Sequence, residues 1–287
     1  MLATAAGGRV YRRHMGTRPR AARERWPTPF VVFTTPRSGS SWLIDLLASH
    51  PRIAAHAELF IVGDRTTPDY GSCDVPRFEA TLDGSRRYGR GTLFVRRVRY
   101  LNRLFDRRPG VQAVGFKLMY LQASAHTGIV PYLAARRARF VHLVRANALD
   151  QIVSYEAALA RNVFRARRGD VVPEVTVRLD APALPARLER MESEVADARR
   201  TVARYRLPAL EVVYEDLADT TGDELTRVVS FLAVEPTAWQ AESSLVGANH
   251  ATRAELIENL SEVEAVLAGT RYEWMLRPGS AHGLGQG

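Results

Sequence analysis

The chain has 287 residues, 46% of them hydrophobic, which is enough for one large α/β core or two small ones, and one domain is the default expectation. Its 40 basic and 31 acidic residues give a net charge of +9, which favours an anionic ligand. No run approaches 18 apolar residues and Cys73 is the only cysteine. These facts exclude a typical transmembrane helix, an intrachain disulfide and a cysteine-based zinc site.

We further expect a metal-independent, cytoplasmic protein. Its seven histidines show no metal-ligand spacing such as H-E-x-x-H. Residues 1–26 contain seven arginines but no apolar core, so we expect a basic, mobile arm there rather than a secretory signal, with a single domain over residues 27–287. No basic helix or basic–aromatic alternation stands out, so a small anion is favoured over nucleic acid, and stable membrane insertion is not expected.

The domain opens with Pro29–Trp42, PFVVFTTPRSGSSW. An apolar run at Phe30–Phe33, a Gly/Ser turn and an apolar-periodic stretch over residues 42–49 predict a strand, a tight loop and a helix. The free amides at the start of such a helix, together with the charge of Arg37, suit a phosphate-like anion. The loop also offers the hydroxyls of Ser38, Ser40 and Ser41. It lacks the first Gly and the Lys of a Walker A motif, which argues against a Walker-type triphosphatase.

The next strands bring two charged residues to the same edge of the sheet. Ile53–Ala57 predicts a short strand that leads to Glu58, and Val111–Leu118 predicts a buried strand with Lys117 near its end. Residues 61–92 suggest an irregular insertion, followed by a helix over residues 92–107. Lys117 is the only lysine among the 40 basic residues, so we expect a site that needs a compact ammonium, although one lysine left by chance is the alternative.

In the middle of the chain, predicted strands continue to alternate with predicted helices. A helix is predicted from about 124 to 137, and Phe140–Val144 predicts a strand. Asn147 is the expected N-cap of the following helix, with Asp150 as its reciprocal partner. Residues 162–182 form a long irregular segment, which we expect to be a lid or an acceptor-binding segment.

The last third predicts two capped helices and a fifth strand. An amphipathic helix over residues 184–205 could form a homodimer seam, but its short stripe favours packing on its own sheet. Leu210–Tyr214 predicts the strand, and capping boxes begin helices at Thr221 and Thr252, the second ending at Gly269. The pattern indicates a three-layer α/β fold with a mainly parallel sheet. Ligands of such sheets bind at the carboxyl ends of the strands, where the loop, Glu58, Lys117 and Arg145 fall.

Three motifs carry a family resemblance. Thr35–Trp42, T-P-R-S-G-S-S-W, resembles the 5′-phosphosulfate loop of sulfotransferases that use 3′-phosphoadenosine 5′-phosphosulfate (PAPS), where a Lys usually stands at Arg37. The strand ending in Arg145 and the helix carrying Ser154 resemble the 3′-phosphate motif, with a spacing similar to the bacterial and carbohydrate-type branch. Tyr214-Glu-Asp-Leu resembles the Y-E-D-[LM] element, whose tyrosine lies near the adenine. Filling the core is an equally weighted alternative for Tyr214.

The resemblance implies a P-loop NTPase-like sulfotransferase fold, PAPS as co-substrate and PAP as product. The acceptor would be a hydroxyl of a carbohydrate, glycolipid or secondary metabolite. In the cytosolic branch a His in K-T-H is the base, whereas this chain has Lys117-Leu-Met, so Glu58 in H-A-E-L-F is the candidate base; a solvated salt bridge is its alternative role. Lys117 would neutralise charge near the transferring group, and Arg37 with the loop amides, including Gly39 and Trp42, would hold the 5′ end. His56 and His142 are expected to be packing residues.

Two other functions remain open from the sequence. A P-loop-type small-molecule phosphotransferase would need Mg²⁺. A non-catalytic anion-binding or nucleic-acid-binding protein would use the same positive charge without turnover.

Overall fold

The computed structural model describes residues 26–61, 75–84, 86–246 and 253–277. The predicted mobile arm, apart from Trp26, lies outside these described residues. So do Cys73, the proposed capping residue Thr252 and much of the predicted insertion, namely residues 62–74 and 85.

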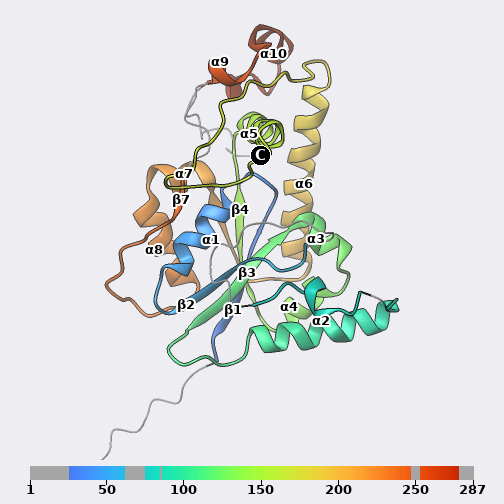
Figure 1. Ribbon diagram of the computed structural model, residues 1–287, viewed down its shortest axis with the longest axis vertical. Coiled ribbons are helices and arrows are strands. Elements are labelled where there is room, and N and C mark those ends of the chain that lie inside the picture. The colour runs from blue at the N-terminus through green and yellow to red at the C-terminus, as the bar shows by residue number, and fades with distance from the viewer. Residues whose placement is uncertain (1–25, 62–74, 85, 247–252, 278–287) are drawn as a thin grey trace, which may run out of the picture.

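A parallel five-stranded sheet forms the centre of the fold (Figure 1), in the order β2-β3-β1-β4-β6. Its strands are β1 Thr28–Thr34, β2 Ile53–Glu58, β3 Ala113–Met119, β4 Arg139–Val144 and β6 Ala209–Val213. All five strands expected from the sequence are present, and the fold class is confirmed. Because every pair is parallel, the carboxyl ends of the strands share one edge, which we call the carboxyl edge.

Helices cover both faces of this sheet, which makes three layers. Alternate residues of β1 face opposite layers: Phe30 and Val32 pack with α1 (Ser40–Ala48) and α8 (Thr221–Phe231). Val31 and Phe33 belong to a second core on the other face. That core is covered by α2 Arg90–Leu104, α4 Ile129–Ala135 and α6 Leu184–Arg204. The alternation follows from the two-residue period of a strand.

A third apolar cluster lies beyond the carboxyl edge and holds α5 (Ala148–Ala160) in place. It joins α5 and the start of α6 to three short C-terminal elements, which are α9 Arg253–Leu256, α10 Leu260–Leu267 and the 3₁₀ turn Glu273–Leu276. Figure 1 shows this group at the opposite end of the sheet from β1's start. Among the helices of the described residues, none has the length and apolar character required to cross a bilayer.

The helix predicted over residues 124–137 is two helices, α3 Tyr120–Ala125 and α4. They are separated at Gly128, whose φ is 90° and whose position leaves no room for a side chain, because a Cβ there would lie 2.7 Å from the Phe94 ring. The periodicity of apolar residues continues across this break, so the pattern alone predicted one helix.

Of the predicted N-cap residues, Asn147 caps its helix and Thr221 does not. Asn147 is the N-cap of α5, and its side chain accepts from the amide of Asp150 as expected. The predicted return bond from Asp150 is not formed, because the Asn147 amide donates to Glu215 and the Asp150 carboxylate pairs with Arg253. Thr221 is not a cap: it is the first residue of α8, and its hydroxyl donates to Leu217 O at 2.8 Å. An unpredicted short helix, α7 Tyr214–Asp219, ends directly before it. The C-terminal helix is also divided, into α9 and α10, and Gly269 with φ 68° follows its end.

Candidate functional site

The loop between β1 and α1 is fastened to its surroundings by hydroxyl groups. Thr34 Oγ1 donates to Leu143 O at 2.7 Å, and Ser38 Oγ donates to Thr35 O at 2.9 Å. The Ser38 side chain is fully buried, so its hydroxyl is used inside the loop. Within the described residues, the amide N–H groups of Ser38 and Gly39 have no hydrogen-bond acceptor. Together with the free amides at the start of α1, they form a donor set that suits an anion.

Tyr214, the first residue of α7, packs directly on this loop. Gly39 has a φ of 84°, and a Cβ on it would lie 2.2 Å from the Tyr214 ring. The Arg145 guanidinium stands over the same ring at 4.8 Å, and the Trp42 ring meets it edge-on at 6.5 Å. Since Tyr214 is only partly buried, its ring can both close the loop and present a surface to a ligand.

The two predicted anion-binding motifs are in direct contact. Arg37, in a left-handed conformation with φ 64°, reaches from the loop to α5, where its Nε donates to Ser154 Oγ at 3.0 Å. Arg145, which follows β4, donates from NH1 to Arg37 O at 3.2 Å. A second Arg37 nitrogen donates to Phe164 O. Arg37 and Arg145 are 108 residues apart in the chain, but the two motifs share one surface at the carboxyl edge.

Four guanidinium groups, which we call the arginine cluster, surround this contact: Arg37, Arg145, Arg161 and Arg165. Burial first, and then the neighbouring charges of Arg145, Arg161 and Arg165, together lower the pKa of Arg37 to about 10. Arg145 Nε is buried and has no hydrogen-bond acceptor among the described residues. Crowded, desolvated like charges and an unsatisfied donor are the features that a polyanion would relieve.

Two polar side chains align this surface: Gln151, which carried no signal in the sequence, and Glu215, which is part of the Tyr214-Glu-Asp-Leu motif. Gln151 on α5 donates to Thr35 Oγ1 at 2.6 Å and so ties α5 to the loop. Glu215 accepts from the amides of Ala146 and Asn147 at 2.9 and 3.0 Å, which fixes the turn between β4 and α5. These bonds hold two segments next to the anion-binding motifs: the anion loop, through Gln151, and the turn between β4 and α5, through Glu215.

Glu58 and Lys117 form a buried ion pair at the same edge. Lys117 Nζ lies 2.8 Å from Glu58 Oε1 and donates to Ser41 Oγ at 3.2 Å. The pairing of β2 with β3 is irregular at this point: His56 is in register with Phe116, and Glu58, not Ala57, is in register with Lys117. This bulge turns Glu58 toward the ammonium. Ser41 opens α1, so the pair adjoins the anion loop.

Gln122 on α3 completes the surroundings of the carboxylate by donating to Glu58 Oε2 at 2.8 Å. Burial alone would raise the pKa of Glu58, but the charge and hydrogen bond of Lys117, the charge of Arg165 and the Gln122 bond bring it below its ordinary value. Glu58 is therefore ionised at neutral pH. Arg165 acts electrostatically on both Glu58 and Arg37, so its charge lies near the carboxylate and near the anion loop.

The segment predicted to be a lid passes over this region. After Phe164, whose carbonyl holds Arg37, the two-residue strand β5 Ala166–Arg167 pairs antiparallel with β7 Leu245–Val246. Just before β7, Ser243 and Ser244 bond to Asp45 on α1 at 2.8 Å. The start of the predicted lid is thus attached to the helix that carries the anion loop.

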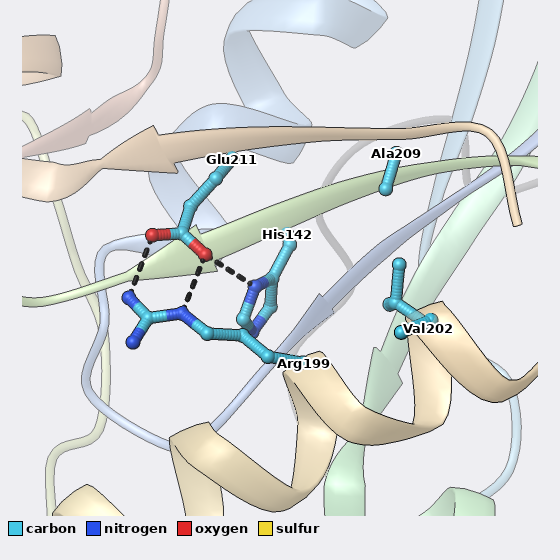
Figure 2. A pocket seen from close by; sticks show the side chains of 6 residues that line it. His142, Arg199, Val202, Ala209 and Glu211 are labelled. Carbon is cyan, nitrogen blue, oxygen red and sulfur yellow. Dashed lines mark hydrogen bonds and ion pairs between the residues drawn. The ribbon is translucent and has the colours of Figure 1, made fainter. Parts of the chain in front are cut away.

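His142 differs from the expectation that it only packs. It is buried, but Nδ1 lies 3.0 Å from Glu211 Oε2 and Nε2 contacts the Tyr120 hydroxyl. Glu211 also accepts two hydrogen bonds from Arg199 on α6, as Figure 2 shows. A pocket of about 220 Å³ opens beside them. A lone histidine between apolar strand residues carries no sequence signal for such a network.

The chain belongs to the sulfotransferase family: residues 29–240, well over half of its length, match the profile described as "Sulfotransferase family". It is therefore a transferase of sulfuryl groups, as the motif resemblance predicted. The bacterial and carbohydrate-type branch stays a prediction. No curated protein sequence matches this chain.

The solved structures similar to this chain include the following three. The sulfotransferase from Alicyclobacillus acidocaldarius has 16% identity and a TM-score of 0.43, covering 84% of this chain and 95% of that one. Mouse sulfotransferase SULT7A1 complexed with PAP has 15% identity and a TM-score of 0.38, covering 90% and 77%. The sulfotransferase domain of the Synechococcus PCC 7002 olefin synthase has 18% identity and a TM-score of 0.36, covering 87% and 90%.

Proposed function

We propose that this protein transfers a sulfuryl group from PAPS to a hydroxyl of a carbohydrate, glycolipid or secondary metabolite, in the cytoplasm and without a metal ion. The observation that carries the proposal is the 3.0 Å contact between Arg37 of the anion loop and Ser154 of the second motif. Two anion-binding motifs that meet in this way can be spanned by one nucleotide with phosphates at both ends. When bound, PAPS supplies the sulfuryl group, and the adenosine bisphosphate PAP leaves.

The arginine cluster and the loop amides grip the donor. The amides of Ser38 and Gly39 and the start of α1, with Ser40 to Trp42, face the 5′ end, while Arg145 and Ser154 serve the 3′-phosphate. Arg145 has a buried Nε without an acceptor in the described part of the chain, which supports this role. Tyr214, beside Arg145, presents its ring to the adenine.

Glu58 accepts the proton of the acceptor hydroxyl. Its lowered pKa keeps it ionised, and its Oε1 and Oε2 each accept one bond, from Lys117 and Gln122, which holds the carboxylate in one orientation. Lys117 places its ammonium between Glu58 and Ser41 of α1 and neutralises charge that develops on the moving sulfuryl oxygens. The acceptor oxygen gains the sulfuryl group as its proton passes to Glu58.

The first prediction concerns Glu58→Gln. This variant keeps the shape and the Gln122 contact but has no basic carboxylate, so kcat should fall by about 10²–10⁴-fold, while PAP still raises the melting temperature. Transfer is measured by mass spectrometry as the gain of one sulfuryl group on a panel of sugars and phenols. Glu264→Gln, at an exposed position of α10, is the matched control. Full activity of Glu58→Gln would remove Glu58 from the proposal.

The same assays separate the alternatives. Transfer that stops when EDTA is added and that uses ATP would favour a phosphotransferase dependent on Mg²⁺. Salt-dependent binding of nucleic acid, without any PAP-induced rise in melting temperature, would favour a non-catalytic nucleic-acid-binding protein.

A further inference from the structure

The short helix α3 has a position that depends on its side chains. A helix of six residues makes too few internal hydrogen bonds to be stable alone. Its first residue, Tyr120, packs edge-on against Phe33 at 4.7 Å. Its third, Gln122, accepts from the Met119 amide at 3.1 Å and donates to Glu58 at 2.8 Å. The helix therefore connects the sheet core with the candidate base.

Tyr120 is also the inner end of a series of hydrogen bonds, which we call the polar chain: Tyr120, His142, Glu211 and Arg199. Burial raises the pKa of Tyr120, so its hydroxyl stays protonated, and it forms a hydrogen bond with His142 Nε2. Because an ionised carboxylate can only accept, His142 donates to Glu211 from Nδ1. Hydrogen bonds first from His142 and then from Arg199 lower the pKa of Glu211 to about 2, so this carboxylate remains a constant acceptor.

The polar chain crosses four elements and reaches the surface. Its members lie on α3, β4, β6 and α6, and the exposed fraction of the side chain rises from 3% for His142 to 37% for Glu211 and 44% for Arg199. The pocket in Figure 2 opens at this outer end, between α6 and the strands. The buried Tyr120 hydroxyl thus has its hydrogen-bond partner in His142, and His142 is in turn held by the half-exposed ion pair of Glu211 and Arg199.

We propose that the polar chain positions Glu58: by holding the Tyr120 hydroxyl, it fixes the first turn of α3 and with it the hydrogen bond from Gln122 to the Glu58 carboxylate. Tyr120, His142 and Glu211 are positioning residues, because none of them contacts Glu58. The effect of this arrangement on catalysis rests on the proposed function. The structural connection from Tyr120 through α3 and Gln122 to Glu58 does not depend on it.

The test is the titration of the Glu58 carboxyl, followed by NMR and assigned with Glu58→Gln. The groups that face it are Lys117 on β3, Gln122 on α3 and the charge of Arg165. Since the Gln122 bond lowers the pKa of Glu58, Gln122→Met should raise it. Tyr120→Phe keeps the ring but removes the hydroxyl, and it should raise the pKa in the same direction. The double variant should show no further rise.

The matched control is Tyr132→Phe, which should leave the titration unchanged, because the Tyr132 hydroxyl on α4 donates to Asn102 on α2 and belongs to no part of the polar chain. Glu211→Gln, at the half-exposed outer end, is the second variant if Tyr120→Phe folds poorly, and it should give a smaller rise. An unchanged Glu58 pKa in the folded Tyr120→Phe or Glu211→Gln protein, beside a raised one in Gln122→Met, would overturn the proposal. An unchanged value in Gln122→Met would overturn it as well.

Kinetics separate this inference from the proposed function. In an active sulfotransferase, Tyr120→Phe should lower kcat by about 10-fold to 100-fold with KM for PAPS unchanged, because the donor is bound elsewhere. If the wild-type protein shows no transfer from PAPS but the Glu58 titration shifts as expected, the proposed function fails and the positioning link stands. If transfer is normal and neither kcat nor the titration responds, the link fails alone.

Discussion

Gly39 combines two constraints that no other residue can meet. Its backbone is left-handed with φ 84°, and the Tyr214 ring occupies the place of a side chain, 2.2 Å from a Cβ. Gly39→Ala would cost about 1–2 kcal/mol in backbone strain and would also displace Tyr214 from the loop. We expect the loss of the PAP-induced rise in melting temperature.

Gly222→Ala, in the first turn of α8 with open space around it, is the control for this second prediction and should bind PAP normally. Normal PAP binding by Gly39→Ala, measured by calorimetry, would mean that the loop does not contribute the site described above.

At the residue scale, the sequence could predict residues that carry recognisable chemistry at motif spacing. Arg37, Arg145 and Ser154 were such residues, and the structure brings them into contact. It also pairs Lys117 with Glu58, but only because of a bulge that a pattern of apolar residues does not reveal. Their roles in binding and catalysis stay predictions.

Other residues gave no signal before the structure. A glutamine in a helix has no spacing rule, so Gln122 and Gln151 were not singled out. His142 is buried, as expected of a packing residue, but its hydrogen bond to Glu211 was not predicted. The hydroxyl of Ser38 was expected to face the ligand but is buried inside the loop, because it serves Thr34 and Thr35. Such assignments depend on contacts between distant segments.

At the element scale, the turn from β4 to α5 is held by one carboxylate. Glu215 on α7 accepts two backbone amides of this turn, directly after Arg145. The third prediction is that Glu215→Ala weakens PAP binding by ~10-fold or more, which equals ~1.4 kcal/mol, because Arg145 loses its fixed position. Calorimetric titration with PAP measures the change.

Asp216→Ala, at the exposed neighbouring position of α7, is the control and should bind as the wild type does. Glu215→Gln retains one acceptor oxygen, so its affinity for PAP should lie between those of Glu215→Ala and Asp216→Ala. Equal affinities for all three variants would show that Arg145 does not need this anchor.

Strand positions were more predictable than helix ends. Each buried strand is a short apolar run with flanking turn residues, and its location follows from that pattern. Helix limits depend on local backbone geometry: α3 and α4 separate where Gly128 takes a left-handed φ of 90°, and Thr221 already lies inside α8, whose N-cap is Thr220. The sequence contains both residues but not their neighbours in space.

At the scale of the whole molecule, the positive net charge of the protein is opposite in sign to the charge of the proposed ligand. The chain carries a net charge of +9, and its arginine cluster gathers four guanidinium groups around one surface. The fourth prediction is that the Kd for PAP rises several-fold between ~50 mM and ~500 mM KCl, because salt screens these charges. Isothermal calorimetry at each salt concentration measures it, with the melting temperature of the ligand-free protein as control. A Kd independent of salt would contradict an electrostatic grip.

The strand order places β1 in the middle of the sheet, with two strands on each side of it. Glu58 and Lys117 lie on the β2–β3 side and Arg145 on the β4 side. In the proposed roles, the group that deprotonates the acceptor lies on one side of the central strand, the grip on the 3′-phosphate lies on the other, and the loop that holds the 5′ end follows the central strand itself. Such a division lets evolution, or a protein engineer, exchange the acceptor half for a new specificity while the donor half is inherited intact.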